Sequence, residues 1–213
     1  MLNSEGRPDI RFDIKGSRPV ANLETQLSLA AAGQTVLSGP AAVPPPPPGF
    51  ALAANLGGPI ADILPASYRD FFGANTALTA NALLRGDGGL DVDSFALQGG
   101  QIHLTGSAAT SKDWFLDRLN VTGDVGSSDG NPVLLPVPGA ATKLKSGHVA
   151  IAFGGASQNW QAAITATGFA NDTLTASKLA INGSGVAANL DDAAQRRLTF
   201  NVDGNVDGVA SGD

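Results

Sequence analysis

Residues that could bind a metal or act in catalysis are few in this chain, and they form no recognised site. His103 and His148 lie far apart, in no HxH or HxxxH pairing, and the chain has no Cys. A thiolate nucleophile and a zinc site with sulfur ligands are therefore excluded. Asp91 and Asp93 point the same way from an extended segment, as residues on the solvated side of a strand do. We predict no catalytic residue, no metal and no cofactor, and an enzyme is not expected.

A short acidic motif near the C-terminus resembles part of a calcium-binding loop. Asp203, Asn205, Asp207 and Gly208 match the first half of the pattern D-x-[DN]-x-[DN]-G. Hydrophobic residues alternate with these polar ones, which is typical of a strand with one solvated face. We therefore interpret the motif as part of a strand.

Composition restricts the class of partner. The 213 residues carry a net charge of −6 and are only 15% charged, while 43% are hydrophobic. Nucleic-acid binding depends on Lys and Arg that neutralise phosphates, so a nucleic-acid partner is not expected. The same acidity disfavours docking on an anionic membrane surface. Without Cys there is no disulfide scaffold.

The main signal is a five-residue unit, apolar-x-apolar-x-Gly, that recurs along the chain. Its period-two alternation places apolar residues on one sheet face and polar residues on the other. We expect each unit to be a short, half-buried strand that ends at a glycine in a turn or bulge. The units are FDIKG (12–16), FALQG (95–99), IHLTG (102–106), LNVTG (119–123), ITATG (164–168), LAING (179–183) and FNVDG (200–204).

The phase of the alternation slips at three places, which predicts three bulges or corners. The slips fall between Val92 and Phe95, between Leu116 and Leu119, and between Ala176 and Leu179. The glycines of the units are irregularly spaced, so a strict-period solenoid is not expected. The predicted fold is all-β, an elongated, curved and mostly antiparallel sheet that forms an open, taco-like groove, with one short amphipathic helix.

Two segments interrupt the strand pattern. Residues 41–49 contain five prolines, which cannot donate to a ladder, and we expect a loop there. This loop is either a polyproline II spacer or a ligand for a proline-binding module. Residues 59–72 have apolar positions at three- and four-residue spacing and predict a short helix that Pro65 divides. We expect this helix to cap an open sheet edge. Strands are expected at 9–16, 22–31, 34–39, 50–56, 74–85 and beyond.

A single sheet with one apolar face must cover that face with another layer or with a ligand. One helix is too little cover for the eleven or twelve strands expected, so we predict a long hydrophobic groove. The candidate groove residues are Leu90, Val92, Phe95, Leu97, Ile102, Leu104, Leu119, Val121, Ile164, Leu179, Ile181, Phe200 and Val202. The alternative is a surface adhesin or a structural β-stalk, β-helix-like, with a closed interior.

Four segments carry a resemblance to a known family. GGPIADILPASYRDFFG (57–73), LDVDSFALQGGQIHLTGSA (90–108), PVLLPVPG (132–139) and WQAAITATGF (160–169) together resemble TamB, the translocation and assembly module component of the AsmA-like superfamily, α-proteobacterial type. The resemblance implies a periplasm-spanning groove for anterograde phospholipid transport between inner and outer membrane, or for outer-membrane protein assembly. It also implies a TamA-like barrel partner in the outer membrane.

The ends of the chain bear on location. Residues 2–20 carry charges and no apolar core of a signal peptide, and no run is long enough for a spanning helix. We interpret residues 1–213 as an internal segment of a repetitive β-groove. The resemblance implies a periplasmic location, with an inner-membrane anchor outside this segment and barrel contacts made through other parts of the protein.

Overall fold

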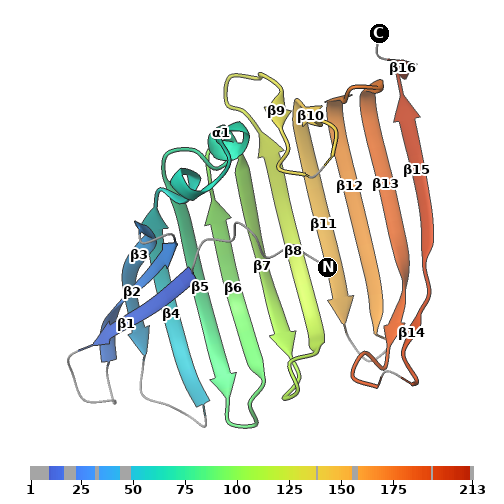
Figure 1. Ribbon diagram of the computed structural model, residues 1–213. Helices are drawn as coiled ribbons and strands as arrows, with labels where there is room; N and C mark the ends of the chain where they lie inside the picture. Colours follow the sequence, from blue (N-terminus) through green and yellow to red (C-terminus); the bar gives the residue numbers. More distant parts are fainter. Residues whose placement is uncertain are drawn as a thin grey trace.

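The computed structural model describes residues 10–16, 23–31, 34–43, 49–137, 139–154, 158–192 and 194–211. Within them the chain forms one 16-stranded antiparallel sheet (Figure 1). Neighbours in sequence are mostly neighbours in the sheet, in the order β1 to β8, then β11, β12, β13 and β15. The short strands β9, β10, β14 and β16 attach at the strand ends. The predicted fold class, a mostly antiparallel, open sheet with a single short helix, is confirmed.

The long strands have the following bounds. They are β1 (Ile10–Gly16), β2 (Leu23–Ala31), β3 (Gln34–Val43), β4 (Gly49–Gly58), β5 (Thr76–Arg85), β6 (Leu90–Gln98), β7 (Ile102–Thr110), β8 (Leu116–Gly126), β11 (Ser146–Gly154), β12 (Asn159–Ala170), β13 (Leu174–Ala188) and β15 (Asn201–Asp207). The short strands are β9 (Val133–Leu134), β10 (Lys143–Leu144), β14 (Arg197–Leu198) and β16 (Ala210–Ser211).

The N-terminal strands agree with the alternation, and their bounds differ at the proline-rich segment. The expected strands at 9–16, 22–31 and 34–39 correspond to β1, β2 and β3. Residues 41–43 belong to β3 and Gly49 belongs to β4, so the predicted loop 41–49 is too long at both ends. Residues 44–48 lie outside the described part of the chain.

The helical segment is shorter and more broken than predicted. It consists of two 3-10 turns, η2 (Ile60–Ile63) and η3 (Ala66–Tyr68), and one α-helical turn, α1 (Arg69–Phe72). Pro65 divides it, as expected, because proline favours the start of a new helical turn. Figure 1 places α1 over the ends of the strands rather than along the edge strand, so it does not cap a sheet edge.

Two of the three predicted bulges are present. The pairing register shifts between Val92 and Phe95 in β6 and at the start of β8, next to Leu116. The predicted slip near Ala176 is wrong, because β13 keeps one register with both of its neighbours. The positions opposite Ser177 are Gly168 and Gly208, which have φ of 59° and 62°. The change of phase in β13 is thus accommodated by the left-handed conformations of these two glycines, and the pairing register does not shift.

Glycines of the repeat unit play a different part from the expected one. Gly106, Gly123 and Gly183 lie inside strands, without a positive φ. A Cβ at Gly183 would lie 2.8 Å from the Trp160 ring, and a Cβ at Gly106 would lie 2.9 Å from the Phe95 ring. Large side chains of neighbouring strands therefore lie across these glycines. The glycines of the repeat unit therefore provide positions without a side chain inside strands, where a neighbouring side chain can lie, as well as turns.

The clearest buried cluster lies at the N-terminal end of the sheet. Leu27, Leu37, Ala41 and Leu56 are buried together, and Ile60 of η2 is one of the residues packed against them. Toward the C-terminal end, the strands are covered less, and every residue of β15 is exposed. Within the described residues, β1 and β15 do not pair with each other, so the sheet is open.

Candidate functional site: an apolar sheet face

The strand registers align the apolar positions into continuous rows. Residues directly opposite each other in antiparallel strands point to the same face of the sheet. One row crosses eight neighbouring pairs of strands through Leu56, Leu78, Leu97, Leu104, Gly123, Val149, Ile164, Ile181 and Gly204. A parallel row contains Ala54, Ala80, Phe95, Gly106, Val121, Ile151, Ala162, Gly183 and Val202. We call this side of the sheet the groove face.

Twelve of the thirteen residues predicted to line the groove lie on this face. They are Leu90, Val92, Phe95, Leu97, Ile102, Leu104, Leu119, Val121, Ile164, Leu179, Ile181 and Val202. Phe200 is different, because it lies between β14 and β15, outside the paired strands, and is 71% exposed.

Several groove-face residues were not among those candidates. The alternation of β11 places Val149, Ile151 and Phe153 on the face, and Trp160 joins them from β12. Their period-two pattern carried the same signal as the chosen residues. No sequence signal pointed to Leu135 and Leu144, which reach the groove face from outside the main strands.

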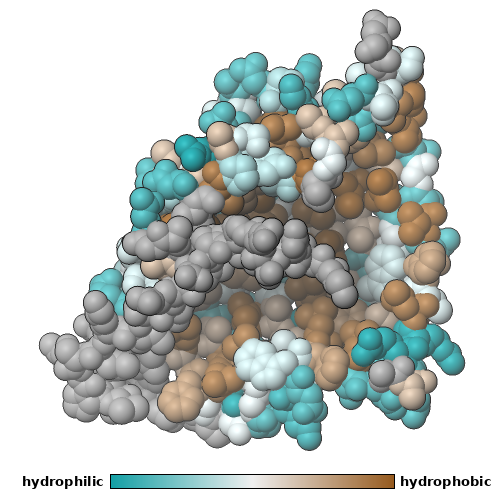
Figure 2. All heavy atoms as spheres, in the orientation of Figure 1, coloured by the Kyte–Doolittle hydropathy of each residue, from teal (hydrophilic) through white to brown (hydrophobic). Residues whose placement is uncertain are grey.

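The groove face is apolar and only partly covered. Figure 2 shows it as a hollowed, hydrophobic surface between polar residues at the two strand ends. Ile164 and Val202 are 40% and 59% exposed, although both lie in the rows of paired apolar residues. Extended apolar surface of this kind marks binding sites more often than it marks a free surface.

The opposite face is polar. His103 and His148 both lie on it, each directly opposite Asp124 in the middle strand. The Nδ1 atom of His148 lies 2.7 Å from a carboxylate oxygen of Asp124, and both side chains are largely exposed. Among the described residues, no group of three or more His, Asp or Glu side chains could hold a metal ion. The calcium-like motif lies largely within the exposed strand β15, which confirms the strand interpretation.

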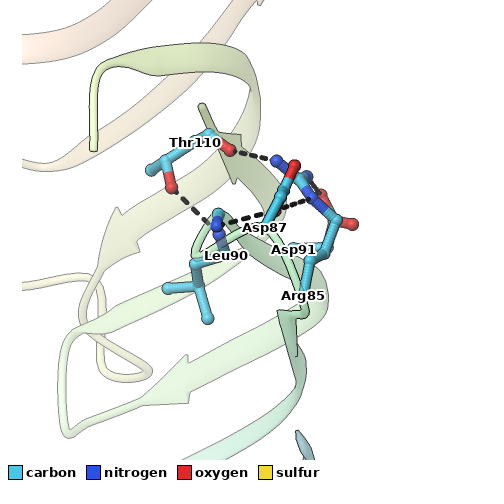
Figure 3. Close-up of polar contacts among 6 residues, drawn as sticks. Arg85, Asp87, Leu90, Asp91 and Thr110 are labelled. Carbon is cyan, nitrogen blue, oxygen red and sulfur yellow. Dashed lines mark hydrogen bonds and ion pairs between the residues drawn. The ribbon is translucent and has the colours of Figure 1, made fainter. Parts of the chain in front are cut away.

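A polar cluster fixes the turn between β5 and β6 to the end of β7 (Figure 3). The Arg85 guanidinium donates to Asp91 at 2.6 Å and to the Thr110 carbonyl at 2.8 Å. Asp87 accepts hydrogen bonds from the Gly89 N–H and from Arg85, and these bonds hold the pKa of its carboxyl below the ordinary value. Every group of the cluster has a partner, so it serves to hold the turn.

One end of the groove face is covered by two segments. The helical segment and the β9–β10 hairpin lie at the same end of the strands (Figure 1). We call the hairpin, residues 133–144 without Pro138, the flap. Val133 is fully buried and Leu144 is 6% exposed, so the flap packs tightly. It is held by the Lys145 N–H bonded to the Thr167 carbonyl at 2.8 Å.

Beneath the flap lies a small apolar pocket of about 130 Å³. Leu135 and Leu144 of the flap form its roof, and groove-face residues of β8, β11 and β12 form its floor. Ile164 lines the pocket and is also 40% exposed, so the pocket opens onto the groove face.

The other end of the strands carries exposed hydrophobic residues. Trp114, in the turn between β7 and β8, is 63% exposed and has a φ of 65°. Trp114 lies outside the strand, because β8 begins at Leu116. Phe50 at the start of β4 and Phe115 in the same turn as Trp114 are also exposed. The two ends of the groove face therefore differ, since one has a roof and the other an open, aromatic rim.

Comparisons with known proteins gave no match. The chain matches no protein-family model, no curated protein and no solved structure. Among the described residues, no helix is long and apolar enough to span a membrane.

Proposed function

We propose that this chain is a segment of a non-catalytic, TamB-like hydrophobic groove that carries phospholipid acyl chains between the inner and outer membrane. The observation that supports the proposal is the pair of continuous apolar rows that cross the open sheet and stay partly exposed. Transfer of hydrocarbon from water to such a surface is favourable by about 0.8 kcal/mol per CH2. The phospholipid headgroups would stay in water, so an acidic protein can bind the chains.

The proposal includes the cellular setting that the family resemblance implies. The protein would act in the periplasm, anchored in the inner membrane, and a TamA-like barrel would bind parts of it beyond these residues. A role in outer-membrane protein assembly would use the same groove face, since unfolded barrel strands also present apolar side chains on one side.

The alternative of a surface adhesin or β-helix-like stalk expects a closed interior of stacked side chains. The sheet is open, and groove-face residues such as Val202 are well exposed, so that expectation is not met. An uncleaved membrane helix at the N-terminus of the parent gene would exclude the alternative entirely.

Photocrosslinking in cells tests the proposal. A photoreactive amino acid at Leu97 or Ile181, on the groove face, should capture phospholipid. The same photoreactive amino acid at Gln98 or Asn182, one position further along each strand, points to the opposite face. It should capture no phospholipid. Equal lipid labelling from both faces would contradict the proposal.

A further inference from the structure

The flap pocket is suited to the end of a hydrocarbon chain. The groove-face side chains that line it are apolar, with Val125, Val149 and Ala166 on the floor beneath Leu144. His148 and Thr165 also border the pocket, but they belong to the polar face. Apolar cavities of similar size, on the order of 150 Å³, stay dry and bind small hydrocarbons. The pocket is closed by the flap on one side and open along the groove face at Ile164. It therefore has room for a methyl end, and its groove-face side chains offer no polar partner to a headgroup.

The length of the groove face fits one acyl chain laid parallel to the strands. From Leu119 to Val125, both on the groove face of β8, the strand spans roughly 20 Å at ~3.3 Å per residue. The hydrocarbon chains of one bilayer leaflet occupy about 15 Å, half of the ~30 Å core. A chain whose methyl end lies in the flap pocket would thus bring its polar end close to the opposite rim.

The opposite rim is suited to the polar end. Trp114 and Phe115 are exposed there, in a turn that begins with Ser111 and Lys112. Aromatic side chains are common where an apolar surface meets water. Trp114 also occupies a left-handed conformation that favours glycine, so the fold alone does not account for a large side chain at this position.

We propose that the groove binds acyl chains in one orientation, with the methyl end under the flap and the polar end at the rim formed by the β7–β8 turn. This inference rests on the proposed function and adds a direction to it. Each chain would lie along the strands, and chains would be passed sideways from strand to strand across the sheet.

A chain-length series tests the pocket. Saturated fatty acids of increasing length should bind the full-length protein about fourfold more tightly for each added methylene, until the pocket is full. A Cβ at Gly147 would meet Leu144 at 3.5 Å and the Thr165 carbonyl oxygen at 3.6 Å, both ordinary contacts, so the backbone accepts a side chain at this position. Gly147→Leu therefore places a leucine side chain at the pocket and reduces its free volume. This variant should bind short chains like the unchanged protein and stop gaining affinity at a shorter length.

Gly126→Leu is the matched control. Gly126 lies in β8, opposite Ser146 of β11, on the polar face, and a Cβ there meets nothing closer than 3.6 Å. Gly126→Leu should leave the affinity for every fatty acid of the series unchanged. An equal loss of affinity at every chain length in Gly147→Leu, with its melting temperature unchanged, would overturn the inference.

Orientation is tested by paramagnetic broadening of methyl signals. Stearic acid that carries a nitroxide next to its carboxylate should broaden Leu84 and Leu116, at the open rim, and spare Leu135 and Leu144. Stronger broadening at the flap leucines, or equal broadening at both ends, would overturn the inference and leave the groove proposal intact. Absence of any fatty-acid binding by the unchanged protein would contradict the proposed function itself.

Discussion

A charge on the groove face should abolish function and leave the fold nearly intact. Ile181 lies in the row between Ile164 and Gly204, near the open side of the sheet. In Ile181→Arg the long side chain can extend along the apolar surface and bring its guanidinium to water. The cost is then the partial loss of hydrophobic burial, about 1 kcal/mol for a side chain that is only partly covered.

A charge at the buried end of the same row should behave differently, because Leu56 belongs to the N-terminal cluster as well as to the groove face. Leu56 is 6% exposed and contacts other buried leucines, so Leu56→Asp leaves a carboxylate without a partner. Such a change costs several kcal/mol. For a protein of this size, each kcal/mol shifts the melting temperature by roughly 2–4 °C. Ile181→Arg should therefore lower the melting temperature by only a few degrees, and Leu56→Asp should lower it by about 10 °C or more.

The assay combines thermal melting with complementation of a deletion strain by the full-length gene. Ile181→Arg and Leu97→Asp should both melt nearly normally and fail to complement. Asn182→Arg, on the polar face next to Ile181, is the matched control. It should melt normally and complement the deletion strain. If Ile181→Arg and Leu97→Asp melt as low as Leu56→Asp, these positions are interior packing and the groove interpretation of the face fails.

Two further predictions concern the fold and its pH dependence. Gly183→Ala should destabilise the protein by about 1–3 kcal/mol because its Cβ meets the Trp160 ring at 2.8 Å; in a Trp160→Ala background most of this cost should vanish, and an unchanged cost in a double-mutant cycle would refute the explanation. The depressed pKa of Asp87, caused first by the Gly89 N–H and also by Arg85, stabilises the folded state above the unfolded-state pKa of about 3.9. This stability is lost as pH falls through the folded pKa, so melting temperature should drop with acidification. The melting temperature of Asp87→Asn should fall less with acidification than that of the unchanged protein. Identical pH profiles of the two proteins would show that the Asp87 turn does not contribute to the pH dependence of stability.

Local chemistry was enough to predict the strands and the face on which the apolar residues lie. Alternation of side chains is a property of any extended backbone, so Leu97 and Gln98 must point to opposite faces wherever the strand lies. The bulge between Val92 and Phe95 was also visible, because a slip in phase has to be absorbed by an extra residue. The slip near Ala176 was misread, since it is accommodated by backbone conformations of two other strands.

The flap and the role of the repeat glycines were decided only by tertiary structure. Leu135 and Leu144 lie in a proline-rich stretch with no strong periodicity, and only the folded hairpin brings them over Ile164. Gly183 looked like the end of a strand, and it is the neighbouring Trp160 ring that requires the missing side chain. Sequence patterns report what one strand does with its own residues. The contents of a groove depend on which strands become neighbours, and that is set by long-range pairing.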